Sequence, residues 1–318
     1  MAWLLEARRP LPTITRNMEP PKITLFSTAL VSTWAFDQTH RVLFDAGDGV
    51  AALLDARIHR IRYAAITHAH RDHCSGLLQL LNLRGSPGDF TVCYPEASGA
   101  ARALATFLSN FDARSTGKVR WVPVAPGSMV PIEPDRHYLR PFETDHYPRM
   151  DPPRALSLGY QIVRHVDKLK PEFMGLPQQE LDALRERHGR AFITHTVEDI
   201  LLTITGDTLP MPPERYAGTR VLIHECTFLD ARERAEMQDR GHPHSCLDEV
   251  LEIAREARVT HLGLYHLSRR YDDHHIRSRV RELCMRMRLP CPVSVALPGT
   301  LHEDLFADPV WKGMPNGS

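Results

Sequence analysis

The sequence predicts an α/β fold in which two sheets pack face to face between two layers of helices. Short β-type runs alternate with helical patterns, and this alternation occurs in both halves of the 318 residues. No repeat with a period of about 20 to 50 residues is visible, which argues against a solenoid. Two similar β-rich halves, each covered by its own helices, fit a four-layer αββα sandwich.

The first half supplies one set of alternating elements. Strand-like runs are expected at residues 23–27, 41–45, 63–67, 90–94 and 119–124. Helical patterns are expected at residues 75–83 and 96–110, where apolar residues recur at helical spacing. This half can therefore form one sheet with helices on its outer face.

The second half shows the same alternation of strands and helices. Strand-like runs are expected at residues 158–163, 200–205, 220–224, 261–265 and 293–296, and helices at 230–240, 245–257 and 272–287. We expect residues 1–20 to be an irregular lead-in, residues 21–300 to form one domain, and residues 301–318 to form a C-terminal tail. A charged segment at about 166–190 is expected to be an insertion that protrudes from the domain.

The composition is that of an ordinary globular chain. Charged residues make up 25% of the sequence, and no run approaches the roughly 20 apolar residues that cross a membrane. The 39 basic and 39 acidic residues cancel, so an RNA partner would need a local basic patch. The six cysteines lack CxxC spacing, which predicts reduced, buried thiols. The apolar start at residues 1–5 is too short for a signal segment and charges follow at Glu6, Arg8 and Arg9, so we expect a cytoplasmic protein without a membrane partner.

Chemistry concentrates in the run His68-Ala69-His70-Arg71-Asp72-His73, directly after the strand-like residues 63–67. His68 and His70 alternate in extended chain and therefore point to the same side, while Asp72 and His73 fall on the turn into a helix. Ligands at the carboxyl end of a strand face a crevice that loops can close. Imidazole and carboxylate suit zinc, so the run predicts two adjacent metals. A solvated, histidine-rich surface turn is the alternative.

The other histidines and the cysteines named here do not indicate a metal site. The chain has 18 histidines, and we expect His59, His137 and the pair His274 and His275 to be surface residues. Cys74 and Cys246 lie beside motifs that carry chemistry, but both are interpreted as small packing residues.

Further motifs follow the histidine run in a fixed order. They are DAGDG at 45–49, TDH at 144–146 with SLGY at 157–160, GDT at 206–208, HECTF at 224–228, HS at 244–245 and YHLSRRY at 265–271. An HxHxDH run after a strand is the hallmark of the metallo-β-lactamase superfamily. Together, these motifs resemble its ribonuclease Z (tRNase Z)-like branch, and the resemblance extends from Asp45 to Tyr271.

The resemblance implies the metallo-β-lactamase sandwich and a two-metal site. It assigns His68, His70 and His146 to one ion, Asp72, His73 and His266 to the other, and Asp207 as the bridge between them. Two Zn²⁺ ions are expected, with Mn²⁺ or Fe as alternatives. A hydroxide shared by the ions would attack the substrate, and Asp72 would orient or deprotonate that water.

The resemblance also assigns a proton donor. Glu225 and His244 would together protonate the leaving oxygen. The alternatives are that Glu225 is a strand-end carboxylate bonded to backbone, and that His244 merely precedes Ser245 as the cap of the next helix. Asp45 is expected to hold a histidine in the correct tautomer and not to bind metal.

The implied function is that of a dinuclear-zinc-dependent hydrolase that cleaves phosphodiester bonds, with tRNA 3′-end cleavage as its most specific form. A phosphodiester substrate, in particular RNA, and a homodimer follow from the same resemblance. Two features depart from the family: its glycine-rich Pro/Arg/Asn loop is not recognisable at residues 27–37, and the insertion that would grip RNA is short and mixed in charge. A weakly basic insertion argues against efficient binding of pre-tRNA.

Three other functions remain open from the sequence. The same metal pair could hydrolyse a small ester, lactone or thioester. The chain could instead be a non-catalytic, metal-holding binding module. An iron-dependent redox protein is a further alternative, although no flavin-binding domain is evident.

Overall fold

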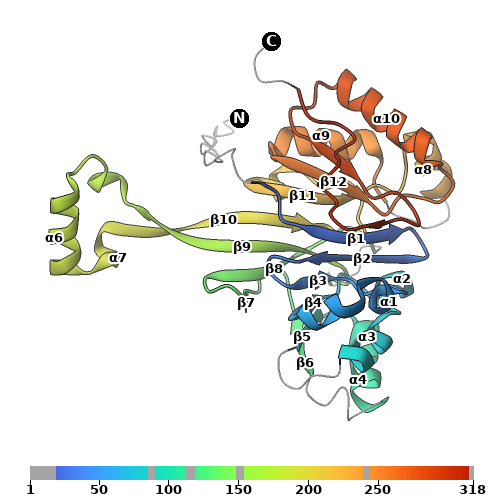
Figure 1. Ribbon diagram of the computed structural model, residues 1–318, viewed down its shortest axis with the longest axis horizontal. Helices are drawn as coiled ribbons and strands as arrows, with labels where there is room; N and C mark the ends of the chain where they lie inside the picture. The colour runs from blue at the N-terminus through green and yellow to red at the C-terminus, as the bar shows by residue number, and fades with distance from the viewer. Residues whose placement is uncertain (1–18, 85–89, 112–118, 148–153, 239–243, 315–318) are drawn as a thin grey trace, which may run out of the picture.

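In the computed structural model, two seven-stranded sheets pack face to face and helices cover both outer surfaces (Figure 1). The structure describes residues 19–84, 90–111, 119–147, 154–238 and 244–314. This arrangement confirms the predicted four-layer αββα sandwich. The expected lead-in at residues 1–20 lies almost entirely outside the described residues.

The first sheet has the order β14-β1-β2-β3-β4-β5-β6. Its strands are β1 (Ile23–Thr28), β2 (Ser32–Asp37), β3 (Val42–Phe44), β4 (Tyr63–Ala65), β5 (Phe90–Pro95), β6 (Val119–Val124) and β14 (Leu301–His302). Its helices are α1 (Val50–Leu54), α2 (Arg71–Cys74), α3 (Leu77–Arg84) and α4 (Gly99–Phe111), with a 3-10 helix at Asp55–Arg60. Pairing is antiparallel from β14 to β3 and parallel from β3 to β6.

The second sheet mirrors this plan in the order β13-β12-β11-β10-β9-β8-β7. Its strands are β7 (Val130–Ile132), β8 (His137–Glu143), β9 (Leu158–Leu169), β10 (Thr194–Ile204), β11 (Thr219–Glu225), β12 (His261–Tyr265) and β13 (Val293–Val295). Its helices are α6 (Gln178–His188), α7 (Arg190–Ile193), α8 (Ala231–Gln238), α9 (Leu247–Ala257) and α10 (Asp273–Arg286), with 3-10 helices at Pro171–Phe173 and Pro213–Tyr216. Pairing is parallel from β13 to β10 and antiparallel from β10 to β7.

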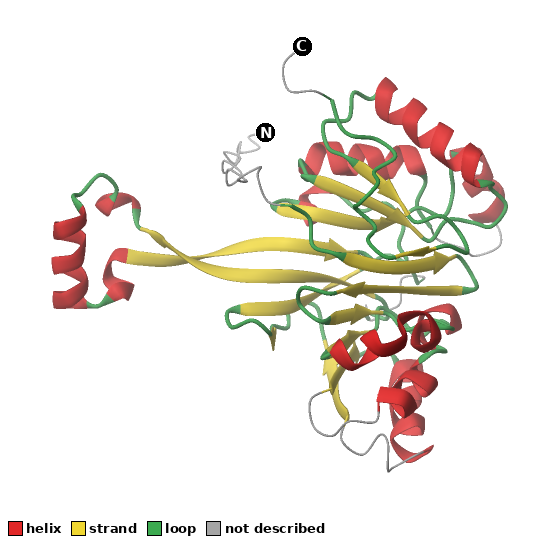
Figure 2. Cartoon of the chain, in the orientation of Figure 1, coloured by secondary structure: helices red, strands yellow, loops and turns green. Residues whose placement is uncertain are grey.

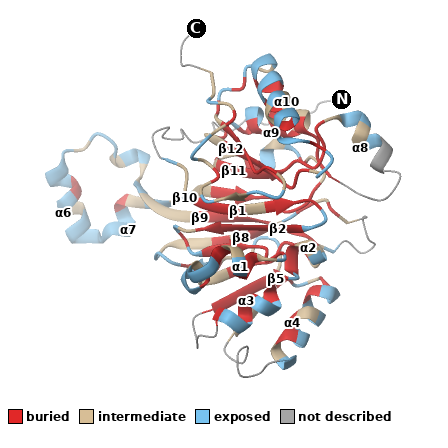
Figure 3. Cartoon of the chain, turned by 45° about the vertical axis from the view of Figure 1, so that its right-hand side comes forward, coloured by how far each residue is buried: buried red, intermediate tan, exposed pale blue. Residues whose placement is uncertain are grey.

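Three apolar cores hold the layers together. The central core lies between the sheets and includes Leu25 and Phe44 from the first sheet and Tyr160 and Ile223 from the second. One outer core joins α9 and α10 to the second sheet, and the other joins α1, α3 and α4 to the first. Figure 3 shows the sheets as an almost continuous buried interior. Each sheet is therefore covered on both faces, which fixes the positions of its strand ends.

Every strand and helix that the sequence predicted within the described residues is present, but four strands were missed: β2, β7, β8 and the two-residue β14, which lies in the expected C-terminal tail. β2 is buried along its whole length, so it has no alternation of polar and apolar residues. β7 and β8 were missed because Pro131 and Pro141 lie within them, and proline within a run argues against a strand. All six cysteines are free and buried, as predicted.

A long two-stranded ribbon extends from the sandwich, and we call residues 165–199 the arm. Beyond Arg164, β9 pairs only with β10, and the ribbon ends in α6 and α7 (Figures 1 and 2). The insertion expected at 166–190 corresponds to the outer part of this arm. The arm carries five Lys or Arg residues against seven Asp or Glu residues. Its surface is therefore not basic overall.

Among the described helices, none combines the length and the apolar character of a membrane-spanning segment.

Candidate metal centre

The site lies along one edge of the sandwich, where strands of both sheets end. The residues at or just after these strand ends are Asp45 after β3, His68 after β4, His146 after β8, Asp207 after β10, Glu225 at the end of β11 and His266 after β12. These strands run in the same direction within their sheets, so their carboxyl ends meet at one edge. Residues far apart in the sequence are thereby brought together.

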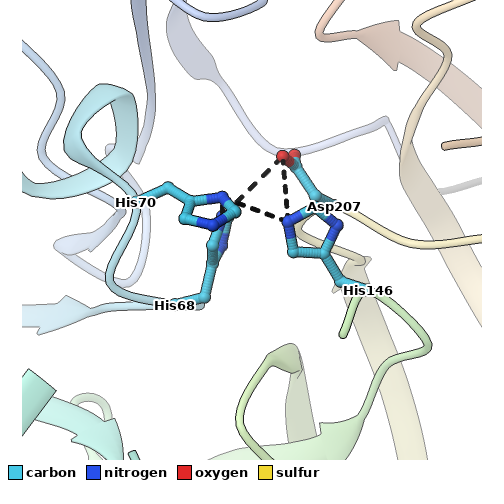
Figure 4. A group of neighbouring side chains, drawn as sticks. All are labelled: His68, His70, His146 and Asp207. Atoms are coloured by element: carbon cyan, nitrogen blue, oxygen red, sulfur yellow. Dashed lines mark hydrogen bonds and ion pairs between the residues drawn. The ribbon is translucent and has the colours of Figure 1, made fainter. Parts of the chain in front are cut away.

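One group of four side chains comes from three of these strand ends. His68, His70, His146 and Asp207 each offer a ligand atom, and these atoms all lie within 4.8 Å of one another (Figure 4). His68 Nε2 lies 3.0 Å from His70 Nδ1, and His146 Nε2 lies 3.2 Å from the same atom. Asp207 Oδ2 is 3.7 Å from His68 Nε2. The three imidazoles therefore converge on one side of this carboxylate.

A second group lies on the other side of Asp207. Asp72, His73 and His266 also place their ligand atoms within 4.8 Å of one another. Asp72 Oδ2 lies 3.6 Å from His73 Nε2 and 3.6 Å from His266 Nε2. Asp207 is 3.3 Å from His73 through Oδ2 and 3.5 Å from His266 through Oδ1. The structure thus brings together all seven residues named from the sequence as ligands, with Asp207 between the two groups.

The chemistry of these groups fits divalent metal ions. Within the described part of the chain, His73 Nε2, His266 Nε2 and Asp207 Oδ1 are buried without a hydrogen-bond partner. Leaving such an atom unsatisfied costs about 1–3 kcal/mol, and all three face the same small space. A cation coordinated by them would remove this cost, and imidazole with carboxylate is a ligand set typical of zinc.

Hydrogen bonds outside these groups turn the imidazoles inward. Thr67 Oγ1 lies 2.9 Å from His68 Nδ1, and Asp45 Oδ2 lies 2.7 Å from His73 Nδ1. Thr227 Oγ1 lies 3.0 Å from His266 Nδ1. Because each Nδ1 is occupied, each Nε2 is left for the centre. Asp45 thus stands where the sequence placed it, behind a histidine.

Asp45→Asn is expected to lower the affinity for metal by about 10- to 100-fold. Asparagine can still accept from His73 but lacks the charge that makes the imidazole more basic. Competition with a chromophoric chelator measures the affinity. Asp48→Asn, an exposed residue of the same loop, is the matched control and should bind metal as the unaltered chain does. Equal affinity in both variants would contradict the assigned role of Asp45.

The charge states of His68, Asp72 and Asp207 suit coordination. Burial would lower the pKa of His73, but Asp207 and Asp45 outweigh it and hold that pKa well above its usual value, so His73 would release a proton on binding metal. Burial and the neighbouring His73 hold the pKa of His68 well below its usual value, so its imidazole is neutral, the form that binds metals. Burial would raise the pKa of Asp72, but the interaction with His266, whose Nε2 lies 3.6 Å away, and the charge of His73 outweigh it and lower the pKa to about 2. In Asp207, burial is likewise outweighed by His266 and His73, so its pKa lies well below the usual value.

Backbone contacts position the ligand loops. Leu158 N donates to Thr67 O at 2.9 Å, and Tyr160 Oη donates to Ile66 O at 2.8 Å, which ties β9 to the loop that carries His68. Gly206 has a φ of 67°, and a β-carbon there would come within 2.8 Å of Thr67 Cβ. Glycine therefore permits the close approach that places Asp207 beside the histidines.

Comparison with known proteins agrees with this geometry. Residues 40–169 match the beta-lactamase superfamily domain. A ribonuclease Z of Pyrobaculum aerophilum is 30% identical over 267 residues, which cover 79% of this chain and 83% of that protein. The chain belongs to the ribonuclease Z-like branch of the metallo-β-lactamase superfamily. It is therefore a hydrolytic enzyme of the metallo-β-lactamase fold.

Solved structures show the same fold as this ribonuclease Z-like chain. The short form of human tRNase Z has a TM-score of 0.57 at 18% identity, with 88% of this chain and 98% of that chain covered. The metallo-β-lactamase fold protein YhfI of Bacillus subtilis has a TM-score of 0.58 at 15% identity, with 89% and 99% covered. Both comparisons support the sandwich architecture.

The ribonuclease Z-like motifs also named Glu225 and His244, and the structure pairs them. His244 Nδ1 lies 3.1 Å from Glu225 Oε1. Burial would lower the pKa of His244, but the charge and hydrogen bond of Glu225 outweigh it and raise the pKa to about 9. His244 also lies beside the metal groups, with a ligand atom within 4.8 Å of those of Asp207 and His266. Its imidazole is therefore oriented at the edge of the centre.

The sequence left one structural alternative for Glu225 and one for His244, and these two alternatives have different outcomes. Glu225 does bond to backbone, because it accepts from the amides of Thr208, Thr227 and Ser245, so its structural role accompanies its contact with His244. Ser245 does not cap α9. Cys246 is the N-cap of that helix, and the Ser245 hydroxyl donates to Thr208 O.

Several site residues were not predicted by the motifs. Thr67 and Thr227 lie within or beside quoted motifs, but nothing in the sequence showed that their hydroxyls bond imidazoles. The Tyr147 ring packs 5.1 Å from that of His146 and 5.4 Å from that of His70. The four histidines expected at the surface lie outside the site: His59, His274 and His275 are exposed, as expected, whereas His137 is half-buried against His40.

Proposed function

We propose that this chain is a dinuclear-zinc-dependent phosphodiesterase that cleaves RNA, acting in the cytoplasm. The observation that carries the proposal is the convergence of two ligand groups on Asp207. A histidine held by a buried carboxylate lies beside them. Membership of the ribonuclease Z-like branch supports RNA as the substrate class.

We assign His68, His70 and His146 to one ion and Asp72, His73 and His266 to the other, with Asp207 shared. Two such cations would polarise the phosphoryl group and supply a water of lowered pKa. Asp72 is the carboxylate placed to orient that water, because Leu30 N donates to its Oδ2 at 3.1 Å and holds it in position. The positions of these residues would therefore also set the direction from which the water attacks phosphorus.

His244 would donate the proton that the leaving oxygen needs. Its Nδ1 faces Glu225, so Nε2 is the nitrogen that can face a substrate. A proton donor matters most when the leaving oxygen is a basic alkoxide, as in RNA. This pair favours a phosphodiester over a lactone or thioester, which are the second class of substrate that the metal groups could hydrolyse.

Cleavage of pre-tRNA is the most specific form of this function. The arm would have to supply phosphate contacts, yet its acidic residues outnumber its basic ones. Asp167 is already paired with Arg136, so part of this charge is neutralised within the protein. We therefore propose weaker binding of tRNA precursors, with a smaller dependence on salt, than a basic arm would give. A homodimer remains a prediction.

The decisive experiment compares substrates on one metal-analysed sample. Pre-tRNA, a short single-stranded RNA, bis-p-nitrophenyl phosphate and a lactone panel are incubated with the chain, and bound metal is counted. We expect turnover of both RNA and the small diester, with two zinc ions per chain. Turnover of lactones alone would overturn the phosphodiesterase proposal.

Metal should also stabilise the fold, since the unfolded chain cannot bring the ligands together. At about 100 times its dissociation constant, a bound ion adds roughly 2.7 kcal/mol and should raise Tm by about 5 °C or more. A thermal melt with and without a chelator measures this shift. Asp207→Asn should show a smaller shift. The same Tm with and without metal in the unaltered chain would contradict the assignment of the ligands.

A further inference from the structure

The turn between β1 and β2 lies against the second ligand group. Leu30 N donates to Asp72 Oδ2 at 3.1 Å, and Ala29 N donates to Leu267 O at 3.3 Å, next to His266. The turn is closed by Val31 N, which donates to Thr28 O at 3.0 Å. Leu30 is therefore fixed beside Asp72 at the edge of the metal centre.

The conformation of Leu30 is unfavourable for leucine. It occupies the third position of the turn with a φ of 66°, in the left-handed region. Glycine or asparagine is favoured at this position, because a branched side chain is strained there. Backbone strain of this kind concentrates at functional sites, where the surrounding structure holds it in place.

The side chain of Leu30 also contributes little to the folded core. Leu30 is 77% exposed, the most of any large hydrophobic residue in the described part of the chain, and the adjacent Val31 is 45% exposed. Two neighbouring apolar side chains in solvent, beside a catalytic centre, mark a contact surface. Neither the conformation nor the exposure of Leu30 is explained by stability.

The chemistry of the turn limits its ligand. Residues 27–36 contain no Lys, Arg, Asp or Glu, so the turn offers no charged side chain to a phosphate. Its exposed side chains can make only apolar contacts. The matching part of a phosphodiester is therefore the organic group on the phosphate: the face of a base or sugar.

We propose that Leu30 and Val31 form an apolar lip that binds the nucleoside next to the scissile phosphate. This inference rests on the proposed phosphodiesterase function and assigns the turn as its specificity determinant. The phosphate would be held at the metal groups, and the nucleoside would cover Leu30, which removes its apolar surface from water. The backbone amide of Leu30 continues to position Asp72.

The test uses two substrates with the same leaving group. Thymidine 5′-(4-nitrophenyl) phosphate carries a nucleoside, and methyl 4-nitrophenyl phosphate carries none. Leu30→Gly and Leu30→Asn both tolerate the left-handed conformation, and should lower kcat/KM for the nucleoside ester about tenfold, mainly through KM. The loss on the methyl ester should be several-fold smaller, since it has no group to reach the lip and any effect through the Leu30 amide that positions Asp72 falls equally on both substrates. Leu30→Met should retain the preference for the nucleoside ester.

Stability and a distant leucine provide the controls. A purely structural role would lower Tm, whereas we expect Leu30→Gly to melt within about 2 °C of the unaltered chain, because the side chain is not buried. Leu83→Asn alters a 46%-exposed leucine of α3 and should leave both substrates unaffected. Equal losses on both substrates, or no loss on either, would overturn the apolar lip alone. An unaltered chain that cleaves neither diester would overturn the proposed function and the lip with it.

Discussion

Asp207→Ala is expected to lower kcat/KM for a phosphodiester by at least about a thousandfold, or roughly 4 kcal/mol of transition-state stabilisation. Asp207 supplies the carboxylate that lies between the two ligand groups: it is 3.7 Å from His68, 3.3 Å from His73 and 3.5 Å from His266. Its removal separates the groups and takes a negative charge from between them. Bound metal should fall below two ions per chain.

Metal analysis and turnover of a small diester measure this result. The matched control is Asp182→Ala, which removes an exposed carboxylate of α6 on the arm and should keep two ions and full turnover of the small diester. Circular dichroism in the presence of a chelator checks that the altered chain folds. A folded Asp207→Ala variant with two bound ions and unchanged kcat would end the proposal of a shared bridging ligand.

The ligand positions were predicted by the resemblance of the motifs to the ribonuclease Z-like branch, and the fold explains why these residues converge. His68, Asp207 and His266 each come within three residues of the end of a strand, and parallel strands bring such residues to one edge. The sequence motifs therefore located the side chains even though no pairing of strands was known. What the motifs could not supply was the identity of the partners behind them. Thr67 and Thr227 have ordinary β-type neighbours, and only the folded geometry shows their hydroxyls against imidazoles.

The protruding insertion at 166–190 was predicted, but the strands that form the arm were not, for a different reason. In β9, residues from Arg164 to Leu169 are half-buried or exposed, because no second layer covers the ribbon beyond the sandwich. The alternation that identifies a half-buried strand is therefore missing, and the segment resembles a charged loop. Ten cross-strand pairs between β9 and β10, from Leu169 and Thr194 to Tyr160 and Ile204, supply the order that the sequence pattern lacks.

The leaving group should decide how much His244 matters. His244→Gln is expected to lower kcat about 100- to 10,000-fold on a dinucleotide, whose leaving oxygen is a basic alkoxide that needs a proton. On a 4-nitrophenyl ester the loss should be less than about tenfold, because that leaving oxygen is stable as an anion. Glu225→Gln should show the same dependence with a smaller loss, since it still accepts from His244 but lacks the charge.

Proton donation by His244 can be distinguished from a role in metal binding or in packing. When His244 is replaced, Glu225 still accepts from the amides of Thr208, Thr227 and Ser245, so its buried carboxylate remains satisfied and the fold should persist. His244→Gln should therefore keep two metal ions and a normal Tm. Equal losses on both leaving groups, or the loss of an ion, would mean that His244 acts on the metal centre itself. Proton donation predicts the opposite: an intact centre whose rate depends on the basicity of the oxygen it releases.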